Sequence, residues 1–213
     1  MQTLYWSPGA CSISPHIVLE EIGHPYRVEQ VTIDQQGTAE VLTSPEYLKI
    51  NPKGRVPALT IDDRVLTEAP AIMTFLARRH PEAQLIPKDP EAEARCFEWM
   101  NWLSTAVHAV AFGQVVRPQR FVTDAKDYPA VIAKGRQNVG TAFAFIEQQL
   151  HGRNWAVPDQ YTIVDAYLLF FYLGSKRAGN PMQERYPAWS QVAERALERP
   201  AVRRVLEHEG MPA

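Results

Sequence analysis

The chain has 213 residues, of which 46% are hydrophobic, and this is enough to bury a core in one large or two small domains. Its 22 basic and 24 acidic residues nearly balance, so no whole-protein charge attracts nucleic acid or an anionic membrane. No apolar run reaches the roughly 18 residues of a membrane span, and the N-terminal segment is too short and too polar for a signal peptide. We therefore expect a cytoplasmic protein with no nucleic-acid partner and no membrane partner.

The first 80 residues alternate short apolar runs with helical patterns. The apolar and β-branched runs predict strands at residues 3–6, 26–33, 56–61 and 65–66, and the turn at Asp62-Asp63 predicts that the last two form a hairpin. Helical spacing predicts helices at residues 14–22, 44–50 and 68–80. Ser14 is placed to cap the first of these helices, and Gly23 is placed to end it. The predicted order is β-α-β-α-β-β-α.

A proline-rich stretch of low apolar content follows this pattern. It carries Pro81, Pro87 and Pro90, so we expect residues 82–90 to link a domain at 1–81 to a second domain at 91–213. The second domain is helical in pattern throughout, with segments expected at residues 91–116, 129–150, 161–173, 187–197 and 200–207. The third segment is almost entirely apolar and should be central. It is preceded by a capping box in which Asp165 takes the place of Glu.

Cys11 stands between the first predicted strand and the first predicted helix. Backbone N–H groups and the helix dipole converge at such a position and favour a thiolate, although a single cysteine can equally be a small buried hydrophobe. The run Cys11-Ser12-Ile13-Ser14 is a C-x-x-S pattern, so Cys11 has no neighbouring thiol with which to close a disulfide. It can pair with an external thiol, and a small-molecule thiol is the expected partner. Cys96, inside a predicted helix, is expected to serve packing.

Two further constellations lie in the first domain. Pro57 leads into a predicted strand, and a cis bond after Val56 would leave the Val56 backbone free to pair with an extended peptide-like ligand. The alternative is an ordinary trans proline at a strand start. Thr67 and Glu68, at the start of the third helix, can recognise the amino-acid end of a ligand, or Glu68 can simply compensate the helix dipole.

The histidines divide into one candidate and several without a site. His108 follows Asn101 by seven residues, which predicts that both lie on one face of the long helix. His108 is either catalytic or a structural residue at an interface. The other histidines have no metal-ligand spacing, and we expect none of His16, His24 and His80 to pair with an acidic ligand set. No metal is expected.

Taken together, the motifs resemble those of a bacterial cytosolic glutathione transferase of the beta class. Three lie in the first domain: Tyr5-x-Ser7-Pro8-Gly9-Ala10-Cys11-Ser12, Ile50-Asn51-Pro52-Lys53-Gly54-x-Val56-Pro57-Ala58-Leu59 and Leu66-Thr67-Glu68-Ala69-x-Ala71-Ile72. Three lie in the helical part: Glu98-Trp99-x-Asn101 with His108, Tyr161-Thr162-Ile163-x-Asp165-Ala166-Tyr167-Leu168 and Glu198-Arg199-Pro200-x-Val202. Each motif alone is weak, but the six occur in family order across the whole chain.

The resemblance implies a thioredoxin-like N-terminal α/β domain, an all-α C-terminal domain and a homodimer. It also implies roles for particular residues toward glutathione. Cys11 would contact the glutathione sulfur, and Val56 with a cis Pro57 would pair with the cysteinyl backbone. Glu68 and Ala69 would bind the γ-glutamyl end with Lys53 nearby, and Asn101 and His108 would line the side of the thiol and the electrophile.

The leading hypothesis is therefore a detoxifying glutathione transferase that conjugates the thiol to electrophilic, largely apolar small molecules, with Cys11 and His108 as the catalytic residues. Two alternatives remain open. The first is a glutathione-dependent thiol reductase or peroxidase that acts through a Cys11 mixed disulfide, and the second is a non-catalytic ligand-binding protein of the same fold.

Three positions depart from the family pattern. Ala69 lacks the hydroxyl that many relatives carry there, and Gln35-Gln36 stand where a basic residue often captures the glycine carboxylate of glutathione. Ala109 replaces a lysine common in relatives, which predicts an electrophile site that has lost a charge.

Overall fold

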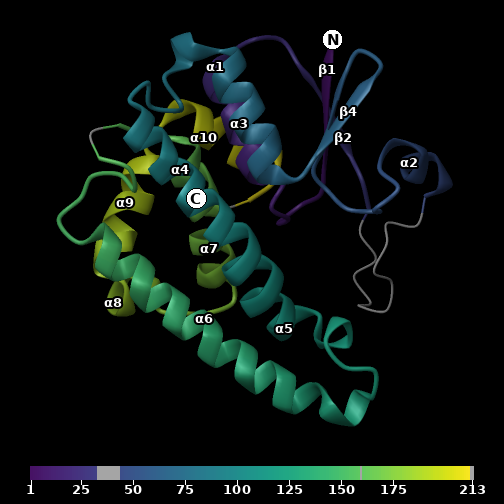
Figure 1. The fold of residues 1–213 in the computed structure, drawn as a ribbon, viewed down its shortest axis with the longest axis vertical. Helices are drawn as coiled ribbons and strands as arrows, with labels where there is room; N and C mark the ends of the chain where they lie inside the picture. Colours follow the sequence, from purple (N-terminus) through teal and green to yellow (C-terminus); the bar gives the residue numbers. More distant parts are fainter. Residues whose placement is uncertain (33–43, 159, 212–213) are drawn as a thin grey trace.

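The structure is a computed structural model that describes residues 1–32, 44–158 and 160–211 (Figure 1). Its N-terminal part is built on a four-stranded sheet of order β2-β1-β3-β4. The strands are β1 (Gln2–Trp6), β2 (Arg27–Gln30), β3 (Ala58–Ile61) and β4 (Arg64–Thr67). β1 pairs in parallel with β2 and antiparallel with β3, and β3 and β4 form the predicted hairpin.

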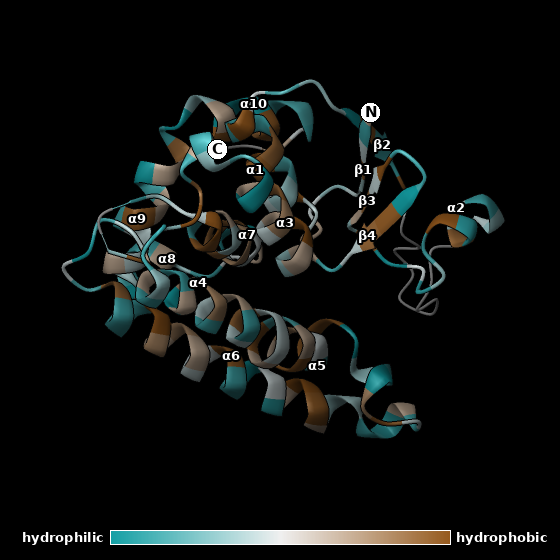
Figure 2. Ribbon diagram, turned by 45° about the horizontal axis from the view of Figure 1, so that its top comes forward, coloured by the Kyte–Doolittle hydropathy of each residue, from teal (hydrophilic) through white to brown (hydrophobic). Residues whose placement is uncertain are grey.

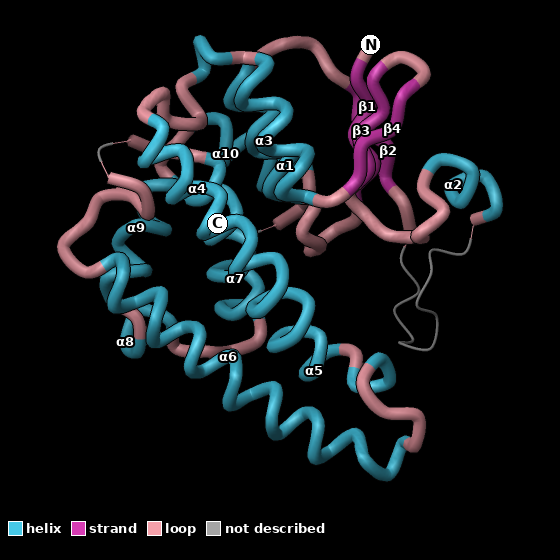
Figure 3. The backbone as a smooth tube through the Cα atoms, in the orientation of Figure 1, coloured by secondary structure: helices cyan, strands magenta, loops and turns pink. Residues whose placement is uncertain are grey.

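Three helices complete this part: α1 (Ile13–Ile22), α2 (Pro45–Ile50) and α3 (Ala69–Arg79). Figure 3 shows α1 and α3 on one side of the sheet and α2 on the other. The alternation of side chains along a strand explains the two layers, because Leu4 and Leu59 pack in the main core with α1 and α3, whereas Ala58 packs with Tyr47 of α2. The predicted order of strands and helices is confirmed.

The first helix begins differently from the prediction. α1 starts at Ile13, with Ser12 at the N-cap position, so Ser14 lies inside the first turn instead of capping it. The Ser14 hydroxyl is buried and has no hydrogen-bond partner among the described residues. The other end agrees with the prediction, because Gly23 has a φ of 74° and its N–H donates to the carbonyl of Leu19.

The C-terminal part is helical. Its long helices are α4 (Pro90–Trp102), α6 (Tyr128–Leu150), α7 (Ile163–Arg177), α9 (Pro187–Leu197) and α10 (Pro200–His208), with short helices α5 (Gly113–Val116) and α8 (Met182–Arg185). As predicted, α7 is central, and it contacts α1, α3, α4 and α9. In the ranges that the structure describes, no helix combines the length and apolar character needed to cross a membrane.

The capping box before α7 is confirmed. The Asp165 carboxylate accepts hydrogen bonds from the backbone N–H groups of Ala156 and Thr162, each at 2.8 Å, and from the Thr162 hydroxyl at 3.2 Å. Burial nevertheless raises the pKa of Asp165 to about 6. The box therefore fixes the start of the central helix with a carboxylate that is reluctant to ionise.

The predicted 91–116 segment is continuous, but its middle is a π-helix, η2 (Leu103–Phe112). At its end the N–H of Gly113 donates to the carbonyl of His108, five residues back. Each turn of a π-helix contains more residues than an α-helical turn, so side-chain positions advance differently along this stretch.

The predicted linker is packed against the helical part. Leu85 is in the main core, and its carbonyl accepts a hydrogen bond from the N–H of Ile163 at 3.0 Å. The Gln160 side chain also donates to the carbonyl of Gln84 at 2.8 Å. Residues 84–85 are thus held to the start of α7.

Candidate functional site

A cavity of about 1040 Å³ opens between the sheet-containing part and the helical part. One wall comes from three loops at the ends of strands, residues 9–11, 54–57 and 67–70. The other wall comes from η2, α5 and the segment after it, α6, and the C-terminal ends of α7 and α8. Six of the predicted site residues line this cavity: Cys11, Val56, Pro57, Glu68, Ala69 and His108.

Cys11 lies in the turn that joins β1 to α1. The turn is closed by Ser12, whose hydroxyl accepts from the Ser7 N–H at 3.1 Å and donates to the Ser7 carbonyl at 3.3 Å. Cys11 Sγ is 3.7 Å from the carbonyl oxygen of Val56. Burial raises the pKa of the Cys11 thiol to about 12 against the lowering effect of its backbone hydrogen bond. The free protein therefore holds a thiol, and the thiolate reading of Cys11 is wrong in this state.

The Val56-Pro57 peptide bond is cis, as the resemblance implies. Tyr47 and Asn51 fix the preceding loop, because both side chains donate to the carbonyl of Arg55, at 2.7 and 2.5 Å. Within the described part of the chain, nothing accepts a hydrogen bond from the Val56 N–H. The loop therefore presents an unused backbone donor to the cavity at a fixed place. Sequence reasoning missed the two side chains that hold it.

Glu68 precedes α3 in an unusual backbone conformation, with a φ of 72°. Such positive φ values are strained for non-glycine residues and gather at functional sites. Lys53 is not a lining residue, but its ammonium group donates to the Glu68 carboxylate and, at 2.7 Å, to the Thr67 hydroxyl. Ala69 is the first residue of α3, so this corner offers an exposed carboxylate beside the N–H groups of a helix N-terminus.

His108 projects from η2 among aromatic rings. Its Nδ1 is 3.5 Å from the Tyr167 hydroxyl, and the ring of Phe170 lies 5.3 Å away between centroids. Burial, and then the positive charges of three nearby arginines, lowers the pKa of His108 to about 4. The imidazole is therefore neutral at physiological pH and can donate one N–H to a ligand.

The structure separates Asn101 from His108. Asn101 is exposed and lines a second groove, together with residues of α3 and α4, whereas His108 lines the cavity. The expectation of a shared face is wrong because it assumed α-helical periodicity through residue 108. The change to η2 after Trp102 rotates the later side chains away from the predicted direction.

Arginines are the feature of the site that sequence reasoning missed. Six line the cavity: Arg55, Arg117, Arg120, Arg136, Arg177 and Arg185. The single acidic lining residue in the described part of the chain is Glu68. Ala109, which stands where relatives often carry a lysine, lines the cavity. The six arginines nevertheless make the cavity strongly cationic. Gln35 and Gln36, where relatives often carry a basic residue, lie outside the described residues.

Comparison with known proteins identifies the family. The chain is 32% identical to the glutathione S-transferase GstA of Escherichia coli O157:H7, over 98% of each chain. The chain belongs to the glutathione S-transferase family. The family's N-terminal domain model matches residues 9–79, and its C-terminal domain model matches residues 105–200.

Solved structures of glutathione transferases agree with this assignment over the whole chain. A glutathione transferase homologue from Sulfitobacter with bound glutathione is 29% identical, covers 100% of this chain and 99% of its own, and has a TM-score of 0.89. A bacterial beta class glutathione S-transferase from Sphingomonas chungbukensis is 29% identical, covers 99% of this chain and 100% of its own, and has a TM-score of 0.82. The predicted fold and the resemblance to bacterial glutathione transferases are both confirmed.

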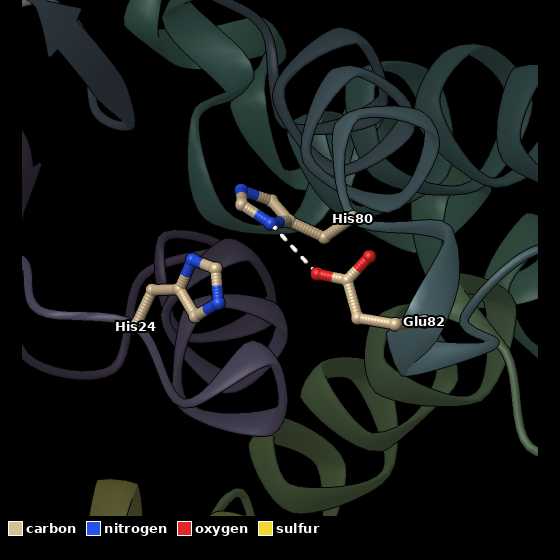
Figure 4. Close-up of side chains that lie close together, drawn as sticks. All are labelled: His24, His80 and Glu82. Carbon is tan, nitrogen blue, oxygen red and sulfur yellow. Dashed lines mark hydrogen bonds and ion pairs between the residues drawn. The ribbon is translucent and has the colours of Figure 1, made fainter.

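Two histidines of this transferase form contacts that the sequence did not predict. His80 Nδ1 is 3.1 Å from Glu82 Oε1, and the imidazole of His24 lies beside them, with ligand atoms of all three within 4.8 Å of one another (Figure 4). Buried His16 likewise pairs with Glu209 at 2.8 Å. The expectation that these histidines lack acidic partners is wrong: Glu82 is a sequence neighbour of His80, whereas His16 and Glu209 come together only in the folded chain. The His24 cluster supplies donor types that zinc accepts, but it does not line the cavity.

Proposed function

We propose that this transferase binds glutathione along the N-terminal wall of the cavity and transfers its sulfur to small electrophiles, a detoxifying activity expected in the cytoplasm. The observation that carries the proposal is the convergence of three recognition points on one wall. These are the thiol of Cys11, the unused N–H of Val56 beside cis Pro57, and the corner formed by Glu68 and Ala69. All three line the same cavity, as a tripeptide that contacts each of them requires.

Two parts of the tripeptide have complementary groups. The backbone of the cysteinyl residue pairs with the N–H and C=O of Val56, as in β-augmentation. The γ-glutamyl carboxylate binds at the N-terminus of α3, and its ammonium group binds the Glu68 carboxylate. In the free protein the Lys53 ammonium contacts Oε1 of that carboxylate, so we expect the ammonium group of glutathione to compete with Lys53 for Glu68.

The wall opposite the tripeptide explains how the thiol is activated. A glutathione sulfur beside Cys11 lies in the field of the cavity arginines, which favours the thiolate. His108 is neutral and stabilises that thiolate by donating its N–H, so it is not a strong base. The thiolate then forms a bond to the electrophilic carbon, a leaving group such as halide departs with its electron pair, and the thiol proton goes to solvent.

The role of Cys11 separates the proposed transferase from the reductase alternative. Its raised pKa disfavours turnover through a Cys11 mixed disulfide, because the thiol and not the thiolate is the resting form. Cys11 then contacts the glutathione sulfur without supplying the nucleophile. Cys11→Ala should retain conjugation of a model aryl halide, and complete loss of conjugation would contradict this division of roles.

Titration calorimetry with glutathione tests the proposal against the non-catalytic alternative. Binding with a dissociation constant in the millimolar range or below, together with glutathione-dependent conjugation of 1-chloro-2,4-dinitrobenzene, is the expected result. Absence of both heat and thermal stabilisation at millimolar glutathione would overturn both enzyme readings.

We also propose that the protein is a homodimer that uses the second groove. This groove is lined by Leu66 of β4, by α3 residues that include Phe75, and by Phe97 of α4. Hydrophobic residues also colour much of β4 brown in Figure 2, and one of them, Val65, is 44% exposed. A second copy would cover this apolar strip. Light scattering that reports a monomer at micromolar concentration would contradict the homodimer.

The division of the chain at residues 82–90 also stays a proposal. The lining of the cavity supports this division, because Cys11, Val56, Glu68 and Ala69, proposed to bind the tripeptide, precede residue 82, and the proposed electrophile wall follows residue 90. A fragment comprising residues 1–81 that retained glutathione binding would support this division.

A further inference from the structure

The helical wall of the cavity carries a cluster of cations far in sequence from the glutathione-binding loops. Arg117 follows α5, Arg136 lies in α6, Arg177 ends α7 and Arg185 ends α8. The one acidic lining residue among those described, Glu68, belongs to the opposite wall. The helical wall therefore has positive charge without a lining carboxylate of its own.

These arginines do not hold the fold together through ion pairs. Among the described residues, no group forms a hydrogen bond or an ion pair with the guanidinium groups of Arg117, Arg136 and Arg177. Where the chain does use arginine to join elements, the pairing is clear: Arg199 of the segment before α10 contacts both carboxylate oxygens of Glu21 in α1, at 2.5 and 2.8 Å. The cavity arginines thus have capacity left for a ligand.

Arg177 lies against the turn that carries Cys11. Its guanidinium packs on the backbone of Gly9, so that a Cβ atom added at Gly9 would lie only 2.9 Å from Nη1. Gly9 is two residues from Cys11, in the same turn. An anionic group bound by Arg177 would therefore lie near the turn that carries Cys11.

The positive charge of these arginines acts on other residues that line the cavity. Arg117 is among the arginines that lower the pKa of His108, so the charges act on the same space in which the electrophile binds. Clustered positive charges in a partly enclosed cavity repel one another, and an anion relieves that repulsion. Guanidinium groups also match the planar geometry of a carboxylate.

The same wall has an apolar part. Phe112, Tyr167 and Phe170 line the cavity near His108, and the Phe112 and Phe171 rings pack at 5.4 Å. A ligand complementary to both the aromatic residues and the arginines of this wall combines an apolar, preferably aromatic, body with an anionic group. This combination refines the largely apolar electrophile expected from the sequence.

From this arrangement we infer that the second substrate is an anion, an aromatic or similarly apolar electrophile that carries a carboxylate or sulfonate recognised by Arg117, Arg136 and Arg177. The inference rests on the proposed transferase function, in that the helical wall is taken as the electrophile site. Glutathione occupies the other wall through Val56, Glu68 and Ala69.

A matched pair of unreactive probes tests the anion site without turnover. Calorimetry on the protein saturated with S-methylglutathione compares 3,5-dinitrobenzoate with 3,5-dinitrobenzamide, which differ in charge but hardly in size. The carboxylate should bind about tenfold more tightly than the amide, since hydrogen bonds to charged groups are the stronger ones. Higher salt should narrow the difference.

Matched variants assign the preference to the cavity. Arg177→Gln and Arg136→Gln should each reduce the carboxylate-to-amide preference several-fold. Lys176→Gln and Lys134→Gln remove the same charge from neighbours on the same helices, which are exposed like Arg136 and Arg177 but do not line the cavity, and should leave the preference unchanged. The inference fails if the two probes bind equally, or if the lysine variants change the preference as much as the arginine variants do.

Conjugation measured in parallel keeps this result separate from the proposed function. With 4-chloro-3,5-dinitrobenzoate and its amide, rates are divided by the uncatalysed reaction with glutathione, and the anion should be favoured. Equal acceleration of both substrates overturns the anion inference and leaves the transferase function standing. A carboxylate preference in binding without acceleration of either substrate overturns the transferase function and leaves an anion-binding site.

Discussion

The resting state of Cys11 yields the sharpest prediction on the free protein. Burial raises its thiol pKa from 9.0 to about 12, an increase of three units. The thiolate fraction near neutral pH is therefore about a thousandfold smaller than for an unperturbed cysteine, and thiolates are the reactive species. We expect Cys11 to react with iodoacetamide about a thousandfold more slowly than a free thiol at pH 7.

Two neighbouring charges allow the origin of this effect to be tested. Glu68 raises the pKa of Cys11, and Arg55 lowers it. Glu68→Gln should therefore accelerate alkylation of Cys11 at a fixed pH, and Arg55→Gln should slow it. Opposite signs from two substitutions that line the same cavity separate electrostatics from a general loosening of the site, which would accelerate both.

The assay is alkylation at a series of pH values, with Cys11 and Cys96 distinguished by peptide mass spectrometry. Cys96 is fully buried, and its pKa is also raised to about 12, so it should contribute little to the early reaction. A titration midpoint near or below pH 8 for Cys11 would refute the reasoning. It would mean that the helix N-terminus outweighs burial, and it would restore the redox alternative.

The remaining predictions concern stability, the site and metal ions. The folded pKa of Asp165 is raised from 3.8 to about 6, so its contribution to stability is complete below about pH 4 and is lost as pH rises through 6. Over pH 4 to 7 the free energy of unfolding of the wild type should fall by roughly 2 kcal/mol from this carboxyl group, and urea unfolding should show that Asp165→Asn lacks this fall. Parallel pH dependences of the two proteins would contradict it. Gly9→Ala should lower melting temperature and displace Arg177, because Gly9 has a φ of 70° and its added Cβ would meet the guanidinium; an unchanged melting curve would count against this. Because His108 has a pKa of about 4, its protonation should leave no step between pH 6 and 8 in the kcat profile, and a step that disappeared in His108→Gln would show otherwise. Conjugation should be unaffected by EDTA, and a loss restored by zinc would implicate a metal.

Features encoded by local sequence were predictable. The order of strands and helices, the hairpin at Asp62-Asp63 and the capping box at Asp165 each depend on patterns within a few residues. The cis bond before Pro57 came from the family resemblance, because cis bonds are a minority of such bonds and no local pattern selects one.

Features that depend on distant packing were not predictable. The π-helix at η2 breaks the periodicity on which the pairing of Asn101 with His108 relied, and nothing in the composition of residues 103–112 marks it. The cavity arginines are scattered between residues 55 and 185, so only the assembled fold brings them to one space. The same applies to His16 and Glu209, whose contact joins segments 193 residues apart.

A crystal structure of the complex with glutathione tests the central claim most directly. The account predicts the glutathione sulfur beside Cys11, the cysteinyl backbone paired with Val56, and the γ-glutamyl end at Ala69 with Lys53 displaced from Glu68. A tripeptide bound elsewhere, or bound in this cavity with its γ-glutamyl end away from α3 and the Lys53–Glu68 pair intact, would contradict it.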